Sequence, residues 1–399
     1  MSSPAGLDSA DVRIHNLGLL MRRLVDGPSS RSELAAAVGL SRGSVTALVD
    51  VLSDAGLVRE SSVVASGTGR PRTMLTLAAD GFAFAAVQLD ADQAIFLAHD
   101  LAGEELVRVA EHHGRPMGDP DAVIDVAAHV IGAGLDELDS LGRAPVGLTV
   151  VVLAPVGGEP RIVLADTDLG WGQVDVLGML RAREPRLPAD ALLSSDEPAA
   201  LAEAQLLPGE RFVLYLKSNS GIGGAYLADG AFIQGAHALA GAVGHLPVDH
   251  DGLPCACGQR GCLVNVAGPD VVLAAAGMVD VRDRDGLTAA LAAFVERVRA
   301  GEPAATAAFA SASVWIARTI AILRMTLDPS VIVLGGYWAD LSQQIAEATT
   351  PRLRLGVDGA LAPTPPIVAG RLGADAALLG ALHQARDAAI ADPLRLAAR

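Results

Sequence analysis

The chain has few of the residues that stabilise secreted proteins or anchor proteins in membranes. It contains three cysteines in 399 residues, all within one short segment, so no disulfide framework is predicted. The most apolar stretch, residues 144–156, suits a buried strand with its flanks and is too short to cross a bilayer. The N-terminal residues have neither the basic start nor the apolar segment of a signal peptide. These absences favour a cytoplasmic protein with no membrane partner.

Aromatic residues are also scarce. They make up 3% of the chain, whereas hydrophobic residues in total reach 51%, so we expect an interior built from Ala, Val and Leu. A chain of this length should form two or three domains and can bury large cores.

Positive charge is low and unevenly distributed. The formal net charge is −16, and Lys217 is the single lysine, so arginine supplies nearly all the cations. Residues 1–80 hold eight Arg and eight Asp or Glu, whereas residues 81–399 hold 22 basic and 38 acidic residues. Because an acidic body repels phosphates, any contact with DNA is expected from a locally basic face of the first segment.

The three cysteines share a glycine-rich segment with a histidine. Residues 241–265 read GAVGHLPVDHDGLPCACGQRGCLVN, which places His245 before Cys255, Cys257 and Cys262. Three thiolates and one imidazole form a closed four-ligand set that suits structural zinc in tetrahedral coordination. Three unrelated buried thiols are the simpler alternative, because free cysteine is a common core residue. The clustering of all the cysteines favours one Zn²⁺ per chain.

This segment resembles the zinc signature of the ROK family (repressors, open reading frames, kinases). The shared pattern is G-x-x-G-H, nine residues, then C-x-C-G-x-x-G-C-L. Two glutamates that accompany it in family kinases are missing, because Ala242 and Val264 take their places. The resemblance covers nearly everything from residue 81 to about residue 390. It implies an α/β, actin-like ATPase (sugar-kinase-like) fold with two lobes, serving in residues 81–399 as a sensor and oligomerisation domain.

Residues 1–80 are predicted to form a winged helix-turn-helix DNA-binding domain. Apolar residues spaced by three and four predict a helix over 12–25, followed by shorter helices over 33–38 and from the cap Ser41 to about residue 55. The short helices are joined by V-G-L-S, as in a helix-turn-helix. Two alternating segments, LVRESSVV and TMLTLA, flank a glycine-rich tip and form the wing. An ordinary three-helix module with no DNA role is the alternative.

Two groups of polar residues favour DNA binding. Short polar side chains and one arginine lie on the outer N-terminal end of the third helix, which would enter the major groove: Ser41, Arg42, Ser44 and Thr46. Arg70 and Arg72 lie on the wing, where a basic tip can reach phosphates or the minor groove. The wing sequence GRPRTML resembles the G-R-P-x-x-x-L of ROK repressors.

From residue 82 the pattern changes to a mixture of strands and helices. The first half is expected to have strands at 82–89, 94–100, 106–112 and 146–153 and a helix at 119–141. The second half is expected to have strands at 212–218, 223–228, 231–234, 331–334 and 366–369, with helices at 304–328, 341–349 and 374–389. A strand meander followed by a crossover helix and another strand resembles the start of each half of the actin-like fold. Leu169-Gly170-Trp171 resembles the L-G-W that precedes the sugar loop of the family.

The two phosphate hairpins of family kinases are matched unequally. The first, D-x-G-x-T, corresponds to residues 88–92, where Gln88 replaces the acid and Asp90 replaces the glycine that lets backbone meet phosphate. A carboxylate there opposes phosphate binding through its charge and its bulk. The second, G-T-G-I-G-G, corresponds to residues 219–224 and keeps Gly221, Gly223 and Gly224. These glycines serve either a tight turn or a phosphate cradle, and the turn is the favoured interpretation.

The catalytic stretch N-D-A-N-x-A-A-L-A-E corresponds to residues 194–203. Aligning A-A-L-A-E places Ser195 on the catalytic aspartate, and serine has no basicity to take a hydroxyl proton near neutral pH. A one-residue slip would return Asp196 to the site but would break the helical register that follows. Ser195, Asp196 and the three hairpin glycines are the candidate ligand-binding residues. Of the usual sugar contacts His245 remains, and zinc would hold it.

These patterns predict a DNA-binding transcriptional regulator, by resemblance a repressor, whose kinase-like domain is catalytically inactive. The family resemblance implies a homodimer or homotetramer on a pseudo-palindromic double-stranded operator. A small-molecule effector, a sugar or another metabolite, would bind the kinase-like domain. Two alternatives stay open. One is an active sugar kinase with an appended DNA-binding head, and the other is a regulator whose pocket binds no small ligand or answers to a protein partner.

Overall fold

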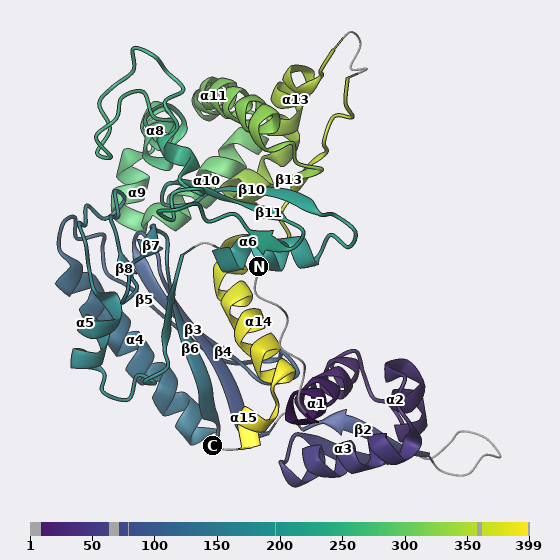
Figure 1. Ribbon diagram of the computed structural model, residues 1–399. Helices are drawn as coiled ribbons and strands as arrows, with labels where there is room; N and C mark the ends of the chain where they lie inside the picture. Colours follow the sequence, from purple (N-terminus) through teal and green to yellow (C-terminus); the bar gives the residue numbers. More distant parts are fainter. Residues whose placement is uncertain (1–8, 64–71, 79, 196, 357–360, 398–399) are drawn as a thin grey trace.

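The structure is a computed structural model that describes residues 9–63, 72–78, 80–195, 197–356 and 361–397. Figure 1 shows a small N-terminal head beside a larger body, and the body consists of two lobes. Each lobe is built on a five-stranded mixed sheet.

The head contains three helices and a two-stranded sheet. The helices are α1 (Ser9–Val25), α2 (Arg31–Val38) and α3 (Arg42–Asp54), and the antiparallel strands are β1 (Val58–Val63) and β2 (Arg72–Leu77). A capping box between Ser30 and Glu33 starts α2, and the Ser41 hydroxyl accepts the Ser44 N–H to start α3. The apolar faces of the helices form a fully buried core that includes Leu17 and Val49. The predicted helix-turn-helix is confirmed as a local structure, and the predicted wing tip lies outside the described residues.

The first lobe follows the predicted meander closely. Its sheet has the order β5-β4-β3-β6-β9, with β3 (Phe82–Leu89), β4 (Gln93–His99), β5 (Glu105–His112), β6 (Ala144–Val152) and β9 (Leu192–Ser194). Strand β3 is antiparallel to β4 and parallel to β6. Helix α4 (Pro120–Ser140) covers one face of this sheet and shares its apolar core. Because β3 is buried on both faces, its sequence is apolar except for Gln88 rather than alternating.

The second lobe repeats this strand order. Its sheet runs β12-β11-β10-β13-β14, with β10 (Phe212–Ser218), β11 (Ile222–Ala228), β12 (Ala231–Phe232), β13 (Val331–Gly336) and β14 (Ile367–Ala369). Its helices include α7 (Val264–Ala267), α8 (Pro269–Ala275), α9 (Val279–Asp285), α10 (Leu287–Arg299), α11 (Pro303–Leu327), α12 (Tyr337–Asp340) and α13 (Ser342–Leu353). The shared strand order confirms the internal repeat expected from the sequence.

Helix α11 is, among the described residues, the one unbroken helix long and apolar enough to span a membrane by length and composition. Half of its most apolar window is buried inside the protein. Its inner face packs in the core of the second lobe with α8, α10 and α13.

The C-terminal helix connects all three parts. Helix α14 (Ala376–Ala391) packs along α6 (Glu197–Gln205) and β3, and its far end lies against α1 (Figure 1). The two helices approach closely at Gly18, where a Cβ atom would lie 3.1 Å from the carbonyl oxygens of Ile390 and Ala391. One apolar cluster therefore runs from the head through α14 into both lobes.

Several short elements of the structure have no counterpart among the predicted strands and helices. These are β7 (Val156–Gly157), β8 (Ile162–Val163), α5 (Val176–Arg183), β9 and α15 (Leu394–Ala397). They span two to eight residues, which is too short for periodicity to distinguish them from loops. Strand β12 is also shorter than the predicted segment 231–234.

Candidate functional site

The four predicted metal ligands converge in the second lobe. One ligand atom from each of His245, Cys255, Cys257 and Cys262 can be chosen so that all four atoms lie within 4.8 Å of one another. Cys262 is buried, His245 and Cys255 are partly buried, and Cys257 is exposed. The four residues grouped by the sequence therefore form a cluster in the structure.

Tight turns bring these ligands together. The Gly261 N–H donates to the Leu253 carbonyl at 2.8 Å, and the Cys255 N–H donates to the Gln259 carbonyl at 2.8 Å. Gly261 has a φ of +66°, and a Cβ atom there would lie 1.7 Å from the Asp249 carbonyl oxygen. Glycine is therefore required at this position by both conformation and space.

The distances in the cluster fit a tetrahedral zinc ion. The Cys257 and Cys262 sulfurs lie 3.6 Å apart, and the Cys255 sulfur lies 3.6 Å from His245 Nδ1. Zn–S and Zn–N bonds of usual length at tetrahedral angles give separations of about 3.8 Å and about 3.6 Å. Burial and the neighbouring sulfurs raise the pKa of the Cys262 thiol to about 12, so a cation is needed to make it a thiolate. Burial lowers the pKa of His245, which favours the neutral imidazole that a metal binds.

His245 also faces the first lobe. Its Nε2 atom lies 3.4 Å from the Thr167 hydroxyl, which belongs to the loop after β8. The metal segment of one lobe thereby meets residues 166–169 of the other.

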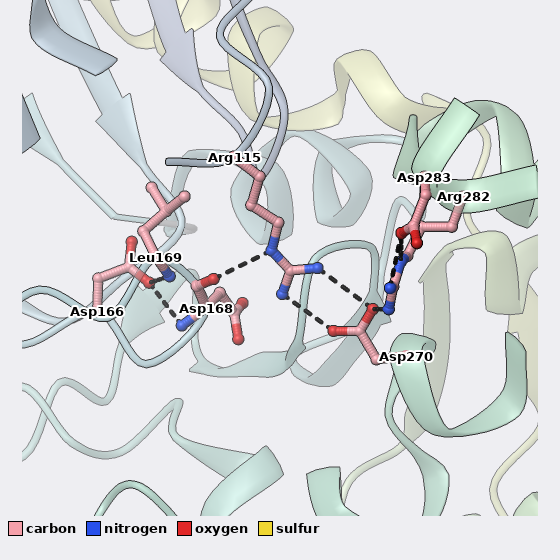
Figure 2. A network of polar contacts seen from close by, with 7 residues as sticks. All are labelled: Arg115, Asp166, Asp168, Leu169, Asp270, Arg282 and Asp283. Carbon is pink, nitrogen blue, oxygen red and sulfur yellow. Dashed lines mark hydrogen bonds and ion pairs between the residues drawn. The ribbon is translucent and has the colours of Figure 1, made fainter. Parts of the chain in front are cut away.

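Two aspartates in that loop have raised pKa values. Asp166 Oδ1 accepts the N–H groups of Asp168 and Leu169 at 2.9 and 3.0 Å (Figure 2). Burial, together with the neighbouring Asp168 carboxylate, raises the pKa of Asp166 to about 6. Removal from bulk water also raises the pKa of Asp168, although a hydrogen bond from Ser220 and the charges of Arg115 and Lys217 oppose that shift.

Asp168 explains one of the candidate glycines in the second hairpin. A Cβ atom at Gly221 would lie 2.4 Å from Asp168 Oδ2, so the hairpin admits the carboxylate because it has no side chain there. A Cβ atom at Gly224 would lie 2.7 Å from the Tyr215 carbonyl oxygen across the β10–β11 pair. Neither position has room for a side chain in the folded protein, so both glycines are explained by packing. This supports the turn interpretation. Gly223 pairs with Lys217 in the same ladder.

The first hairpin is packed against the second lobe. Asp90 is buried, and its Oδ1 accepts the Ala91 N–H at 2.8 Å while Gln88 Nε2 donates to its Oδ2 at 3.3 Å. Burial raises the pKa of Asp90, and the charge of Lys217 opposes this. Ala91 belongs to the apolar core of the second lobe. Protein atoms therefore surround Asp90, whose carboxylate is predicted to oppose phosphate binding.

The remaining candidates are placed as follows. Ser195 is partly buried just after β9, and Asp196 lies outside the described residues, as does Arg70. Arg72 begins β2, although its side chain is not described. The four candidate side chains of α3 are all exposed: Ser41, Arg42, Ser44 and Thr46. Ser41 and Ser44 also share a hydrogen bond of 2.9 Å, and the Thr46 hydroxyl donates to the Arg42 carbonyl.

Comparison with known proteins identifies the larger part of the chain. The family model described as "ROK family" matches residues 86–388, which is well over half of the chain. The chain belongs to the ROK family. This membership confirms the resemblance drawn from the metal segment.

Individual ROK proteins match at low identity. The xylose repressor of Bacillus spizizenii is 21% identical over 259 residues, covering 64% of this chain and 66% of the relative. The match thus spans slightly less than two thirds of that relative. A solved ROK family transcriptional regulator, a homologue of the Escherichia coli MLC protein, has a TM-score of 0.73 at 21% identity and covers 98% of this chain and 100% of that one. A ROK glucokinase from Streptomyces griseus has a TM-score of 0.62 at 21% identity and covers 76% of this chain and 99% of that one. The body therefore has the predicted two-lobed actin-like fold.

Sequence reasoning missed the polar residues that face each other between the ROK lobes. Among them are Arg115 and Asp270, which form an ion pair, and Asp168, whose carboxylate is influenced by the charges of Arg115 and Lys217. Two weak signals were present, because Asp168 directly precedes L-G-W and Lys217 is the single lysine. Arg115 and Asp270 are 155 positions apart, so no local pattern connects them.

Proposed function

We propose that the chain is a DNA-binding transcriptional regulator, a repressor, in which residues 1–80 bind DNA and residues 81–399 form a non-catalytic ROK domain. The observation that carries this proposal is the helix-turn-helix α2–α3, in which the N-terminal end of α3 is exposed. The similarity to proteins named as repressors supports it. A regulator of this kind works in the cytoplasm, where it meets DNA.

The DNA contacts would come from two places in the head. Ser41, Arg42, Ser44 and Thr46 would approach base edges in the major groove, with Arg42 able to bind guanine through two hydrogen bonds. Arg70 and Arg72 on the wing would contact phosphates or the minor groove. Two-fold pairing in a homodimer or homotetramer would present two heads to a pseudo-palindromic double-stranded operator.

The metal cluster would hold one structural Zn²⁺ per chain. His245, Cys255, Cys257 and Cys262 fill all four tetrahedral positions, which leaves none for a reacting water. The ion would supply folding energy to a segment that has little apolar core of its own. It would also fix His245 against Thr167 and so support the contact between the lobes.

The absence of phosphoryl transfer is proposed from the two sites that the reaction needs most. Ser195 replaces the expected base, and the Asp90 hairpin is occupied by its own carboxylate and packed on the second lobe. Removing a general base typically lowers the rate by a factor of roughly 10²–10⁴. Losing phosphate positioning as well removes the main source of acceleration in this chemistry. An effector, a sugar or another metabolite, would bind near Ser195, Asp196 and the second hairpin.

Selection of binding sites from random DNA with the purified full chain tests the proposal. We expect an enriched motif with two related half-sites and an affinity that falls steeply with salt. Arg211→Ala serves as a control, because Arg211 is an exposed arginine next to β10 that pairs with Asp229 within the second lobe. If no motif is enriched, the DNA-binding proposal is wrong.

An ADP-release assay over hexoses, amino sugars and pentoses tests the catalytic half separately. We expect no turnover above background. Turnover that disappears on Asp196→Asn would show that the catalytic loop is shifted by one residue and that the domain is an active kinase.

A further inference from the structure

The two lobes are joined by an ion-pair network. The Arg115 guanidinium, from the loop between β5 and α4, donates two parallel bonds to the Asp270 carboxylate of α8, at 3.2 Å (Nη1–Oδ1) and 3.0 Å (Nη2–Oδ2). Figure 2 shows Arg115 reaching across to Asp270, while its Nε donates to the Asp168 carbonyl at 3.3 Å. Arg282 of α9 donates to the same Asp270 carboxylate at 2.9 Å. This arginine–carboxylate pair is bidentate, which is the strongest geometry such a pair adopts.

The loop that carries Arg115 is itself held in an unusual conformation. Arg115 has a φ of +53°, which a residue with a side chain adopts at some energetic cost. The Arg115 N–H donates to His113 Nδ1 at 3.2 Å, and His113 Nε2 lies 3.1 Å from the Asp90 carbonyl. Gly118 donates to the Leu169 carbonyl at 2.7 Å. These contacts direct the guanidinium toward the second lobe independently of its ion pair with Asp270.

A second cross-lobe contact lies at the tip of the first hairpin. Asp92, in the turn between β3 and β4, accepts the Leu287 N–H at 2.8 Å through Oδ2. Leu287 begins α10, a helix of 13 residues with no side-chain cap of its own, so a carboxylate from the other lobe caps it. Beside it, Ala91 is 3% exposed and packs in the second lobe's apolar core. Gly286 leaves room for this contact, because a Cβ atom there would lie 2.6 Å from Asp92 Oδ2.

We propose that Arg115–Asp270 and the inserted tip Asp90–Asp92 form a built-in latch that holds the two ROK lobes together in this arrangement. The latch combines opposite charges, a helix cap and an apolar plug, and each joins residues of different lobes. Opening the lobes uncaps α10, exposes Ala91 and leaves Arg115 without its bidentate partner. The latch is thus built from this chain's own residues and does not depend on the DNA-binding role. In a regulator, an effector that moves the lobes apart would have to break these contacts.

Hydrogen exchange of the Leu287 amide in the full zinc-loaded chain reports directly on the latch. Its acceptor belongs to the other lobe, so lobe opening exposes this N–H to solvent. We expect Arg115→Ala and Asp270→Asn each to speed this exchange about tenfold, the factor that corresponds to 1.4 kcal/mol. The double variant should be no faster than Arg115→Ala alone, because both changes remove the same pair. Raising the salt concentration should speed exchange in the parent and have less effect in the variants.

Two comparisons separate latch opening from general loosening. Arg284→Ala removes an exposed arginine of the nearby α9 that pairs within its own helix with Asp285, and it should leave Leu287 exchange unchanged. Amides in β3 and β10 should keep their protection in every variant. Where Arg115→Ala fails to fold, Arg115→Lys replaces it, because lysine keeps the charge but cannot make two parallel bonds. Parental Leu287 exchange in both Arg115→Ala and Asp270→Asn overturns the proposal, and so does equal loss of protection in the strands.

Discussion

Replacing Asp166 with asparagine should change how the stability of the ROK domain depends on pH. Asp166 is 6% exposed, and its pKa is raised from 3.8 to about 6. Because the folded state holds the proton more tightly, this group stabilises the fold fully below about pH 3.8. That stabilisation is lost as the pH rises through about 6. The shift of about two units corresponds to a loss of about 3 kcal/mol across the whole range.

The measurable part of this effect follows from the same linkage. Between pH 5 and pH 8 the parent should lose about 1.4 kcal/mol relative to Asp166→Asn, and between pH 4 and pH 8 about 2.4 kcal/mol. The asparagine side chain of the variant keeps an oxygen that can accept the N–H groups of Asp168 and Leu169. Any change that the amide makes to the free energy of unfolding is the same at every pH, so it cancels in the dependence of that free energy on pH.

Urea unfolding followed by tryptophan fluorescence provides the assay. Trp171 is a local reporter, because its backbone N–H and carbonyl both bond to the backbone of Asp166. Asp139→Asn is the control, since Asp139 is an exposed aspartate of α4 in the same lobe. The Asp139→Asn variant should parallel the parent. If the Asp166→Asn curve also runs parallel to the parent from pH 5 to pH 8, burial does not raise the pKa of Asp166 and the reasoning fails.

Three further predictions concern the metal, the head and the α1–α14 contact. Metal analysis should find one zinc per chain and much less in Cys262→Ser, whereas a zinc-free native protein with three freely titrating thiols would contradict the site. In a fluorescence-anisotropy titration, Arg42→Ala should weaken binding to the selected site by roughly 1–3 kcal/mol and relax its sequence choice. Equal binding by that variant and Arg211→Ala would rule out a base contact. In thermal unfolding, Gly43→Ala should stabilise α3 by roughly 0.5–1 kcal/mol, because its Cβ has open space. Gly18→Ala should show no such gain, since its Cβ meets two carbonyl oxygens of α14 at 3.1 Å. Equal gains in both variants would mean that α1 does not rest on α14.

Local patterns predicted much of the fold and the metal cluster. The cap Ser41 starts a helix where its hydroxyl suggested, because capping is decided within a few residues. Helix α2 begins at Arg31, two residues before the predicted start, because Ser30 caps it. The ligand set His245 to Cys262 spans one short segment, so spacing alone was sufficient to group it. Strands such as β3 and β10 were placed to the residue, because their apolar runs are bounded by turns.

The polar contacts between the lobes could not be predicted in the same way. The pairing of Arg115 with Asp270 depends on how two lobes face each other, and neither residue lies in a distinctive local pattern. In the sequence, Asp92 belongs to a segment that resembles a phosphate motif. In the structure it caps a helix that starts 195 positions later. Likewise, Gly221 resembles part of a phosphate cradle in the sequence. In the structure a side chain is excluded there because the Asp168 carboxylate of the other lobe takes the space. Long-range partners of this kind follow from the tertiary structure.

The packing of α1 against α14 also sets an order of events during synthesis. The head occupies the first part of the chain, while the helix on which it rests ends at Ala391. At a translation rate of roughly 5–20 residues per second, about 20 to 70 seconds separate the two segments as they leave the ribosome. During that interval the head has its own apolar core but lacks α14, the helix against which α1 packs. A newly made head can therefore move independently before its own body restrains it, and ribosome stalling late in the message would prolong that state.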